Sequence, residues 1–252
     1  MSGKSAGTTH GSIRAVPTES IPPAALSPLV LVHHAYAGLM QSSPKDSEGL
    51  GGKLLYAGEL DTAGRSLTIA GNISGAATLA ASADPLLARQ AMRDGVIDFL
   101  VNSLDEALRI LKNEIRKQNP VSVGISTSPN LIVEEMLERG VLPNLLPPLL
   151  PSAPAPSGLD AFIAQGARYI ASSSHRDKKL LVWQIPAEYA QRPAGFEALL
   201  LEHLPPGDHA ARRWLQLSPR YLGSQFRRLR SLTCDEQTAA KLIEIFGPPL
   251  EP

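Results

Sequence analysis

The sequence predicts an α/β protein in which a mostly parallel sheet is covered by helices on both faces and is followed by a smaller α+β region. Two observations support this fold class. Short apolar runs alternate with helix-length amphipathic segments between residues 53 and 146, and such alternation requires the crossover connections that build parallel sheets. A proline-rich stretch then separates this part from a second part in which helical patterns predominate.

Composition divides the chain into five segments. Residues 1–25 lack apolar periodicity, which is typical of a disordered tail. Six prolines between Pro143 and Ser157 exclude a helix or a central strand there. We therefore expect a disordered tail at 1–25, a helix and loop at 26–52, the α/β core at 53–146, a proline-rich linker at 147–157 and an α+β region at 158–252.

Within the core, strands and helices are bounded by glycines, prolines and capping residues. The expected strands lie at 53–57, 78–82, 96–101, 121–125 and 141–146. The expected helices lie at 67–73, at 85–94, from Ser103 to the residues before Pro120, and at 130–139. Ser103 followed by Glu106 has the capping-box spacing. Upstream, Ser27-Pro28 suits a helix with proline in its first turn.

The C-terminal region gives a less regular pattern. A helix is expected at 159–165, and two strands at 168–172 and 179–185 around a polar turn. Further helices are expected at 193–204, 208–216 and 235–246, the last of which is closed by Gly247 and Pro248. This region either forms a separate lobe or extends the first sheet.

Bulk composition excludes several classes of protein. The 252 residues include 24 basic and 24 acidic side chains, so the formal charge is zero and no global preference for nucleic acid or an anionic membrane is indicated. No apolar stretch is long enough to span a bilayer, and the N-terminal residues lack the apolar region of a signal peptide. The single cysteine, Cys234, cannot form an intrachain disulfide. We expect a cytoplasmic protein with an inert thiol.

The core resembles a known family. The phrases GKLLYAGELDTAGRSLTIAGNISGAATLAASADP, VIDFLVNSLDEALRILKNE, PVSVGIS and EEMLERGVLPNLL are similar to the Rossmann core of urocanase, also called urocanate hydratase. The resemblance covers residues 53–146. It implies a domain that holds NAD tightly as an electrophile, with which the family hydrates urocanate to imidazolone propionate in histidine degradation.

The cofactor-binding positions that the resemblance implies are largely altered. Gly58 and Gly64 remain from the phosphate-binding turn, but Glu59 and Asp61 place carboxylates where pyrophosphate oxygens would lie. Ser82 stands where the family has an acidic residue for the ribose hydroxyls, and Asp84 is a weaker substitute. We expect no bound cofactor, or NAD if the ancestral site survives.

A second candidate ligand site follows the fourth strand. The family has a Gly-Asn pair at this point, whereas this chain has Ser126, Thr127 and Ser128. These hydroxyls are expected at the carboxyl ends of the strands, where doubly wound sheets bind ligands. The alternative is that Ser128-Pro129 starts the next helix. The family's segment after the fifth strand is replaced by Pro147-Pro-Leu-Leu-Pro.

The family's remaining catalytic phrases have no counterpart in these residues, so no catalytic residue is assigned. The leading hypothesis is a degenerate or repurposed homologue without stand-alone urocanate hydratase activity, which binds a small ligand or acts as a subunit. The enzyme alternative is an NAD-dependent urocanate hydratase-like lyase, or a component of a split one.

Three groups of residues have the composition of metal or catalytic sites. His33 and His34 are adjacent, and adjacent helical residues do not chelate one metal well. The run from Ser172 to Asp177 contains serine, histidine and aspartate, but its pattern is typical of a polar turn. His203, Asp208 and His209 fit a junction between helices. We expect no metal site.

An arginine-rich segment between His209 and Cys234 suggests a further alternative, a module that binds an acidic partner or polyanion. It contains no acidic residue and interleaves aromatic side chains with six arginines, namely Arg212, Arg213, Arg220, Arg227, Arg228 and Arg230. Because the net charge is zero, nucleic acid is an unfavoured partner. An acidic protein, a second copy of this chain, or no partner beyond solvent remain open at this point.

Overall fold

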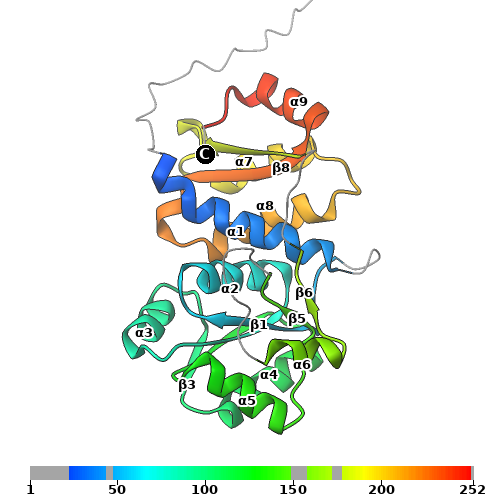
Figure 1. Cartoon of the computed structure of the whole chain (residues 1–252). Helices are drawn as coiled ribbons and strands as arrows, with labels where there is room; N and C mark the ends of the chain where they lie inside the picture. Colours follow the sequence, from blue (N-terminus) through cyan, green and yellow to red (C-terminus); the bar gives the residue numbers. More distant parts are fainter. Residues whose placement is uncertain (1–22, 44–47, 149–157, 172–177, 251–252) are drawn as a thin grey trace, which may run out of the picture.

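A six-stranded sheet forms the centre of the N-terminal part of the molecule (Figure 1). The computed structural model describes residues 23–43, 48–148, 158–171 and 178–250. The sheet order is β3-β4-β2-β1-β5-β6, and every pairing is parallel. Its strands are β1 (Leu54–Glu59), β2 (Ala77–Ala81), β3 (Phe99–Val101), β4 (Val121–Ile125), β5 (Leu145–Leu146) and β6 (Arg168–Tyr169). The predicted parallel α/β fold class is therefore confirmed.

Helices cover both faces of this sheet. The α1 face carries α1 (Pro23–Gln41), α2 (Thr62–Ser74) and α3 (Pro85–Arg93), and the α4 face carries α4 (Leu104–Lys117), α5 (Pro129–Glu138) and α6 (Leu159–Ala164). Connections that run toward β3 carry their helices on the α1 face, and those that run back toward β6 carry theirs on the α4 face. All crossovers therefore have the same hand, as expected of parallel units.

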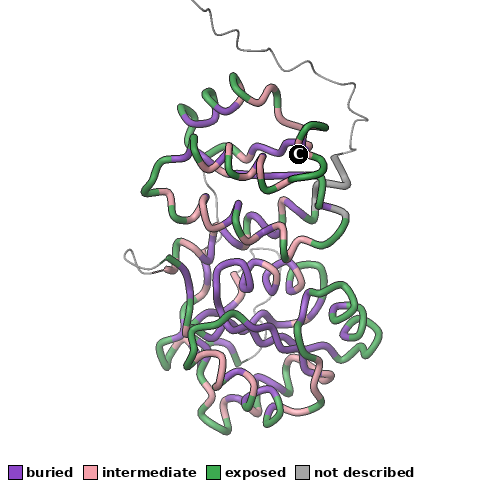
Figure 2. Tube along the Cα trace, turned by 180° about the vertical axis from the view of Figure 1, so that it is seen from behind, coloured by how far each residue is buried: buried purple, intermediate pink, exposed green. Residues whose placement is uncertain are grey.

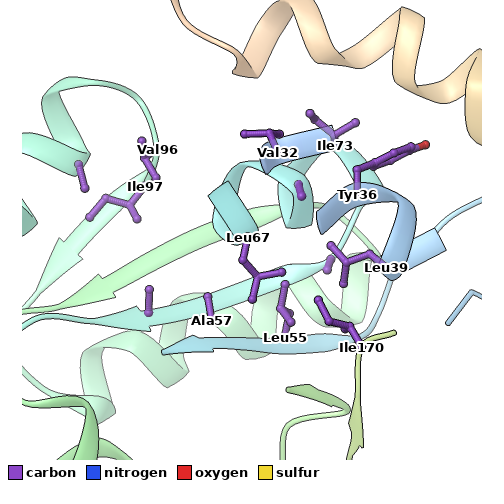
Figure 3. Packing of buried hydrophobic residues seen from close by; sticks show 14 of the residues in the cluster. Val32, Tyr36, Leu39, Leu55, Ala57, Leu67, Ile73, Val96, Ile97 and Ile170 are labelled. Atoms are coloured by element: carbon purple, nitrogen blue, oxygen red, sulfur yellow. The ribbon is translucent and has the colours of Figure 1, made fainter. Parts of the chain in front are cut away.

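The core on the α1 face is closely packed because small residues line the inner side of its helices. Leu39 of α1 points toward Leu55 of β1 and Ile170 (Figure 3). A methyl group built at Gly71 of α2 would lie 2.4 Å from the hydroxyl oxygen of Thr78. Glycine at this position therefore allows the helix to approach the sheet.

The C-terminal part is built on a two-stranded antiparallel sheet. Its elements are β7 (Lys178–Gln184), η1 (Ala187–Tyr189), α7 (Pro193–Glu202), α8 (His209–Tyr221), η2 (Ser224–Phe226), β8 (Leu229–Asp235) and α9 (Glu236–Phe246). Val182 belongs to the core on the α1 face, whereas its neighbours Leu181 and Trp183 pack in a separate cluster with α7 and α9. The strand pair therefore lies between two apolar layers, and buried positions continue from the sheet into this region (Figure 2).

Three local expectations are corrected by the structure. Helix α1 begins at Pro23, and Pro28 lies inside it rather than in its first turn. Residues 168 and 169 do not pair with the strand that follows; they extend the parallel sheet beside β5. The partner of β7 is β8, for which no strand was expected. Each β7–β8 contact joins residues about fifty positions apart, so local periodicity does not report it.

Some expected segments lie outside the described residues. These are most of the N-terminal tail (1–22), most of the proline-rich linker (149–157) and the polar turn at 172–177. Among the helices that the structure describes, none combines the length and apolar character that a membrane crossing requires.

Candidate functional site

Two topological switch points at the carboxyl edge of the parallel sheet, called crevices below, are the expected ligand positions. They occur where neighbouring strands are followed by helices on opposite faces: β1 precedes α2 whereas β5 precedes α6, and β2 precedes α3 whereas β4 precedes α5. Doubly wound sheets bind their ligands at such switch points. The structure places Gly58 and Gly64 at the first crevice.

The loop from Gly58 to Gly64 retains the backbone of a phosphate-binding turn. Gly58 has φ +80°, next to a register irregularity in β1. A methyl group built at Gly64 would lie 1.7 Å from the carbonyl oxygen of Glu59. Glycine is therefore required at Gly64 for the start of α2 to pack against the end of β1, which is the role of the third glycine in dinucleotide-binding turns.

Two N–H groups of this loop already donate to its own carboxylates. Oδ1 of Asp61 accepts a hydrogen bond of 2.8 Å from the Gly64 N–H, at the N-terminus of α2. Oε1 of Glu59 accepts one of 3.1 Å from the Leu60 N–H. A dinucleotide phosphate would need these N–H groups, and it would meet two negative charges where it needs positive potential.

The opposite wall of the first crevice also differs from an open cofactor cleft. Pro147 follows β5, and its Cγ lies 3.8 Å from the position of a methyl group at Gly58. The proline ring therefore stands against the glycine that should admit the pyrophosphate. Together with Glu59 and Asp61, this arrangement does not fit NAD bound in the Rossmann manner.

The second crevice contains Ser82 and Asp84 after β2. Ser82 is fully buried, and its Oγ accepts a hydrogen bond of 3.2 Å from the Asp84 N–H. Oδ1 of Asp84 in turn accepts one of 2.7 Å from the Leu86 N–H and caps α3. Both side chains thus take part in the turn that starts α3.

Ser126, Thr127 and Ser128 lie across this crevice, after β4. All three are half-buried. The Ser126 N–H donates to the carbonyl oxygen of Val101, which fixes the end of β4 against the neighbouring β3. Ser128 occupies the N-cap position of α5 but makes no side-chain capping bond. Of the predicted site residues, these three and the exposed Asp84 present polar side chains that a ligand can reach.

Tyr56 is a residue at this edge that the sequence did not single out. It is buried on β1, and its hydroxyl donates a hydrogen bond of 3.1 Å to the carbonyl oxygen of Pro129, at the start of α5. Burial raises the pKa of Tyr56 well above its ordinary value, and the charge of Glu59 adds to this. The phenol therefore stays neutral and holds α5 against β1.

The remaining metal-like and catalytic groups do not form sites in the described residues. No group of three histidine, cysteine or acidic side chains there has the arrangement of a metal site. Asp208 caps α8 by accepting from the Ala211 N–H, and the His203 ring contacts the carbonyl oxygen of Leu199. Cys234 is buried, and desolvation raises the pKa of its thiol to about 11. The group from Ser172 to Asp177 lies outside the described residues.

The arginine-rich segment does not present six free guanidinium groups. Arg212 donates to the carbonyl oxygens of Leu201 and Leu204 at the end of α7. Arg213 donates to Ile73, and Arg230 is buried in an ion pair with Glu197. Three of the six predicted partner-binding arginines are thus used within the fold. Exposed guanidinium groups are left at Arg220, Arg227 and Arg228.

The fold and the carboxyl-edge geometry define a Rossmann-like domain: a parallel, doubly covered sheet whose first strand leads through a glycine turn into α2. Comparison with protein-family models gives its family. Residues 30–151 match the urocanase Rossmann-like domain. This part of the chain is therefore a urocanase Rossmann-like domain, as its resemblance predicted. The match begins inside α1, upstream of the predicted boundary at residue 53.

Proposed function

We propose that this chain uses the urocanase Rossmann-like domain as a scaffold and does not hydrate urocanate by itself. In this role it binds a small polar ligand at the crevice between β2 and β4, or serves as a subunit of a larger assembly. The proposal rests mainly on one observation, the 2.8 Å hydrogen bond between Asp61 and the Gly64 N–H. It places a carboxylate of the chain at the helix N-terminus where a cofactor phosphate would bind.

Several further features support the loss of the cofactor site. Glu59 adds a second carboxylate to the same loop, and Pro147 stands against Gly58. Hydration of urocanate requires an electrophile that accepts electron density from the imidazole, together with an acid and a base on either side of the acrylate. Without the electrophile, binding urocanate would not lower the barrier, because only interactions gained in the transition state accelerate a reaction.

The crevice between β2 and β4 is the better ligand position of the two. Its hydroxyl groups at Ser126, Thr127 and Ser128 are half-buried, so that a ligand would reach them while losing part of its contact with water. Hydroxyls both donate and accept hydrogen bonds. This arrangement favours a small polar ligand over a dinucleotide.

The proposal is tested by assaying urocanate and NAD together. Urocanate absorbs strongly in the near ultraviolet, so its consumption can be followed directly. We expect purified protein with added NAD to leave this absorbance unchanged relative to the blank, while an intact urocanase assayed in parallel consumes the substrate. We also expect acid denaturation of the protein to release no stoichiometric NAD.

Two results would support the lyase alternative instead. One is release of one NAD per chain on denaturation. The other is steady turnover that survives repurification and is abolished by substitutions in the Gly58–Gly64 loop. Turnover that appears only when another protein is added would instead indicate the split-enzyme alternative, in which this chain supplies one component.

A further inference from the structure

A pocket of about 220 Å³ lies outside the carboxyl edge, where α1, α8 and the β7–β8 strand pair meet. One stripe of α1 lines it, from His33 through Ala37 to Gln41. Lys178 at the start of β7, Thr233 of β8 and the first turn of α8 complete the wall. Most of this lining lies beyond residue 151, so the pocket is formed where the urocanase Rossmann-like domain meets the C-terminal region.

The base of the pocket is aromatic and buried. His33 is 4% exposed, and its ring centroid lies 4.3 Å from that of Trp214. Tyr36 packs 5.0 Å from the same indole, and its hydroxyl donates a hydrogen bond of 2.8 Å to the carbonyl oxygen of Ala210. Figure 3 shows the Tyr36 hydroxyl at the outer end of the core on the α1 face, away from the sheet.

Buried polar groups are also held in place at this base. The Thr233 hydroxyl lies 3.0 Å from Nε2 and 3.1 Å from Nδ1 of His33, so one of the two ring nitrogens is its partner. Burial raises the pKa of Tyr36 well above its ordinary value, so its hydroxyl remains a neutral phenol. Its proton is directed to Ala210, which leaves the phenol oxygen able to accept a hydrogen bond.

Two opposite charges line the same pocket. Asp208 uses Oδ1 to cap α8, at 3.0 Å from the Ala211 N–H, and its second oxygen makes no hydrogen bond among the described residues. Lys178 makes no ion pair with any other described residue, whereas its neighbour Lys179 pairs with Glu236 at 2.8 Å. Desolvation is the main cause of the raised pKa of Tyr36 and of Cys234, whereas Asp208 adds to both shifts and Lys178 opposes that of Cys234.

We propose that this pocket binds a small zwitterion of the size of a free amino acid. In this arrangement the ligand ammonium pairs with Asp208, its carboxylate pairs with Lys178, and its body rests on the apolar surface of Ala37, Met40 and Trp214. The volume is below the roughly 300–1,000 Å³ of typical drug-sized ligand sites, which favours a metabolite of few atoms. The inference is independent of the proposed role of the carboxyl edge.

Isothermal titration calorimetry of the full chain with the twenty common L-amino acids tests this site. We expect at least one of them to bind saturably. Propionate, which offers only a carboxylate, and propylamine, which offers only an ammonium, should bind at least about tenfold more weakly, because each lacks one charge-assisted hydrogen bond. Binding should also change the tryptophan fluorescence, since Trp214 lines the pocket.

Matched variants locate the site. Asp208→Asn removes the charge but keeps an oxygen that caps α8, so the fold should persist while affinity falls at least about tenfold. Asp235→Asn makes the same change at the cap of α9, outside the pocket lining, and should leave affinity unchanged. Lys178→Gln should weaken binding, whereas Lys179→Gln should not.

Three outcomes would contradict the proposed zwitterion site. Failure of all twenty amino acids to bind at millimolar concentration would overturn the proposal. So would equal affinity for L-alanine, propionate and propylamine, or binding that Asp208→Asn and Lys178→Gln leave intact in proteins with wild-type circular dichroism. None of these results bears on the urocanate and NAD assays. The zwitterion site and the proposed role of the carboxyl edge are therefore tested independently.

Discussion

Four aspartates, at 61, 84, 208 and 235, occupy N-cap positions, and each accepts a hydrogen bond from a backbone N–H in the first turn of its helix. Two of these helices, α2 and α3, begin at the carboxyl edge of the sheet, and the N-terminus of the first one is where a Rossmann domain normally offers free N–H groups to phosphates. All four aspartates stabilise their helices. Asp61 has a second effect, because it places negative charge at this phosphate position.

The contribution of Asp61 to stability can be measured directly. Asp61→Ala removes the oxygen that accepts from the Gly64 N–H, and we expect it to lower the free energy of unfolding by about 1 kcal/mol in urea denaturation. Asp61→Asn keeps a capping oxygen and should therefore lower the free energy of unfolding much less. Equal stability of wild type and Asp61→Ala would show that the carboxylate is not needed as a cap.

At the scale of elements, α8 joins the two parts of the molecule. Trp214 contributes to the core on the α1 face, and Leu215 to the cluster around α7 and α9. Arg213 extends from α8 to the end of α2, where its Nε donates a hydrogen bond of 2.7 Å to the carbonyl oxygen of Ile73. Its Nη1 donates to the carbonyl oxygen of Glu48 at 3.3 Å. A cation here also opposes the partial negative charge at the C-terminus of α2.

Arg213→Met tests this connection. The substitution keeps much of the aliphatic stem but removes charge-assisted hydrogen bonds, so we expect a loss of about 1.5–3 kcal/mol in the free energy of unfolding. Arg220→Met is the control, because Arg220 is exposed and contacts only the face of Tyr221 among the interactions that the structure describes. Equal effects of the two substitutions would contradict a structural role for Arg213.

The sequence was informative about elements whose partners are close along the chain. The central strands β1, β2 and β4 are apolar runs bounded by turns, and Ser103 with Glu106 marks the start of α4, so these could be located. Strand β8 could not be located from the sequence. Its residues lie within an arginine-rich segment, and its pairing with β7 depends on a contact across α7 and α8.

The same distinction holds for the candidate sites. The hydroxyls at 126–128 and the glycines of the first turn follow directly from strand ends, and the structure brings them to the predicted edge. The pocket at α1 and α8 was not predicted. His33, Lys178, Asp208, Trp214 and Thr233 come from four elements and one loop end, and no local motif joins them. His33 looked like a member of an adjacent histidine pair, although its relevant neighbours are Thr233 and Trp214.

At the scale of the whole molecule, the two parts share one apolar core. Residues of α1 and α2 cluster with Val182, Trp214, Phe226 and Leu229 from beyond the linker. Neither part therefore buries its apolar surface completely without the other. In Figure 1, α1 lies between the parallel sheet and the β7–β8 strand pair, which is the arrangement that such a shared core requires.

We expect this shared core to make unfolding a single cooperative transition. In urea, far-ultraviolet circular dichroism and tryptophan fluorescence should report the same midpoint. Trp214→Ala should shift the midpoint of both probes equally, with Trp183 as the remaining fluorophore. Trp214→Ala should lower the free energy of unfolding by about 3–5 kcal/mol, because Trp214 is 1% exposed and its removal leaves a large cavity.

Leu131→Ala provides the control for this substitution, because its side chain is 57% exposed on α5 and its loss should leave the midpoint nearly unchanged. If Trp214→Ala lowered the fluorescence midpoint while a large part of the circular dichroism signal kept the wild-type midpoint, the parallel sheet would be folding independently. In that case the packing of α8 and the β7–β8 pair on α1 would be a docking contact between separate domains. Coincident shifts would instead mean that the urocanase Rossmann-like domain of this chain depends on its C-terminal region for stability.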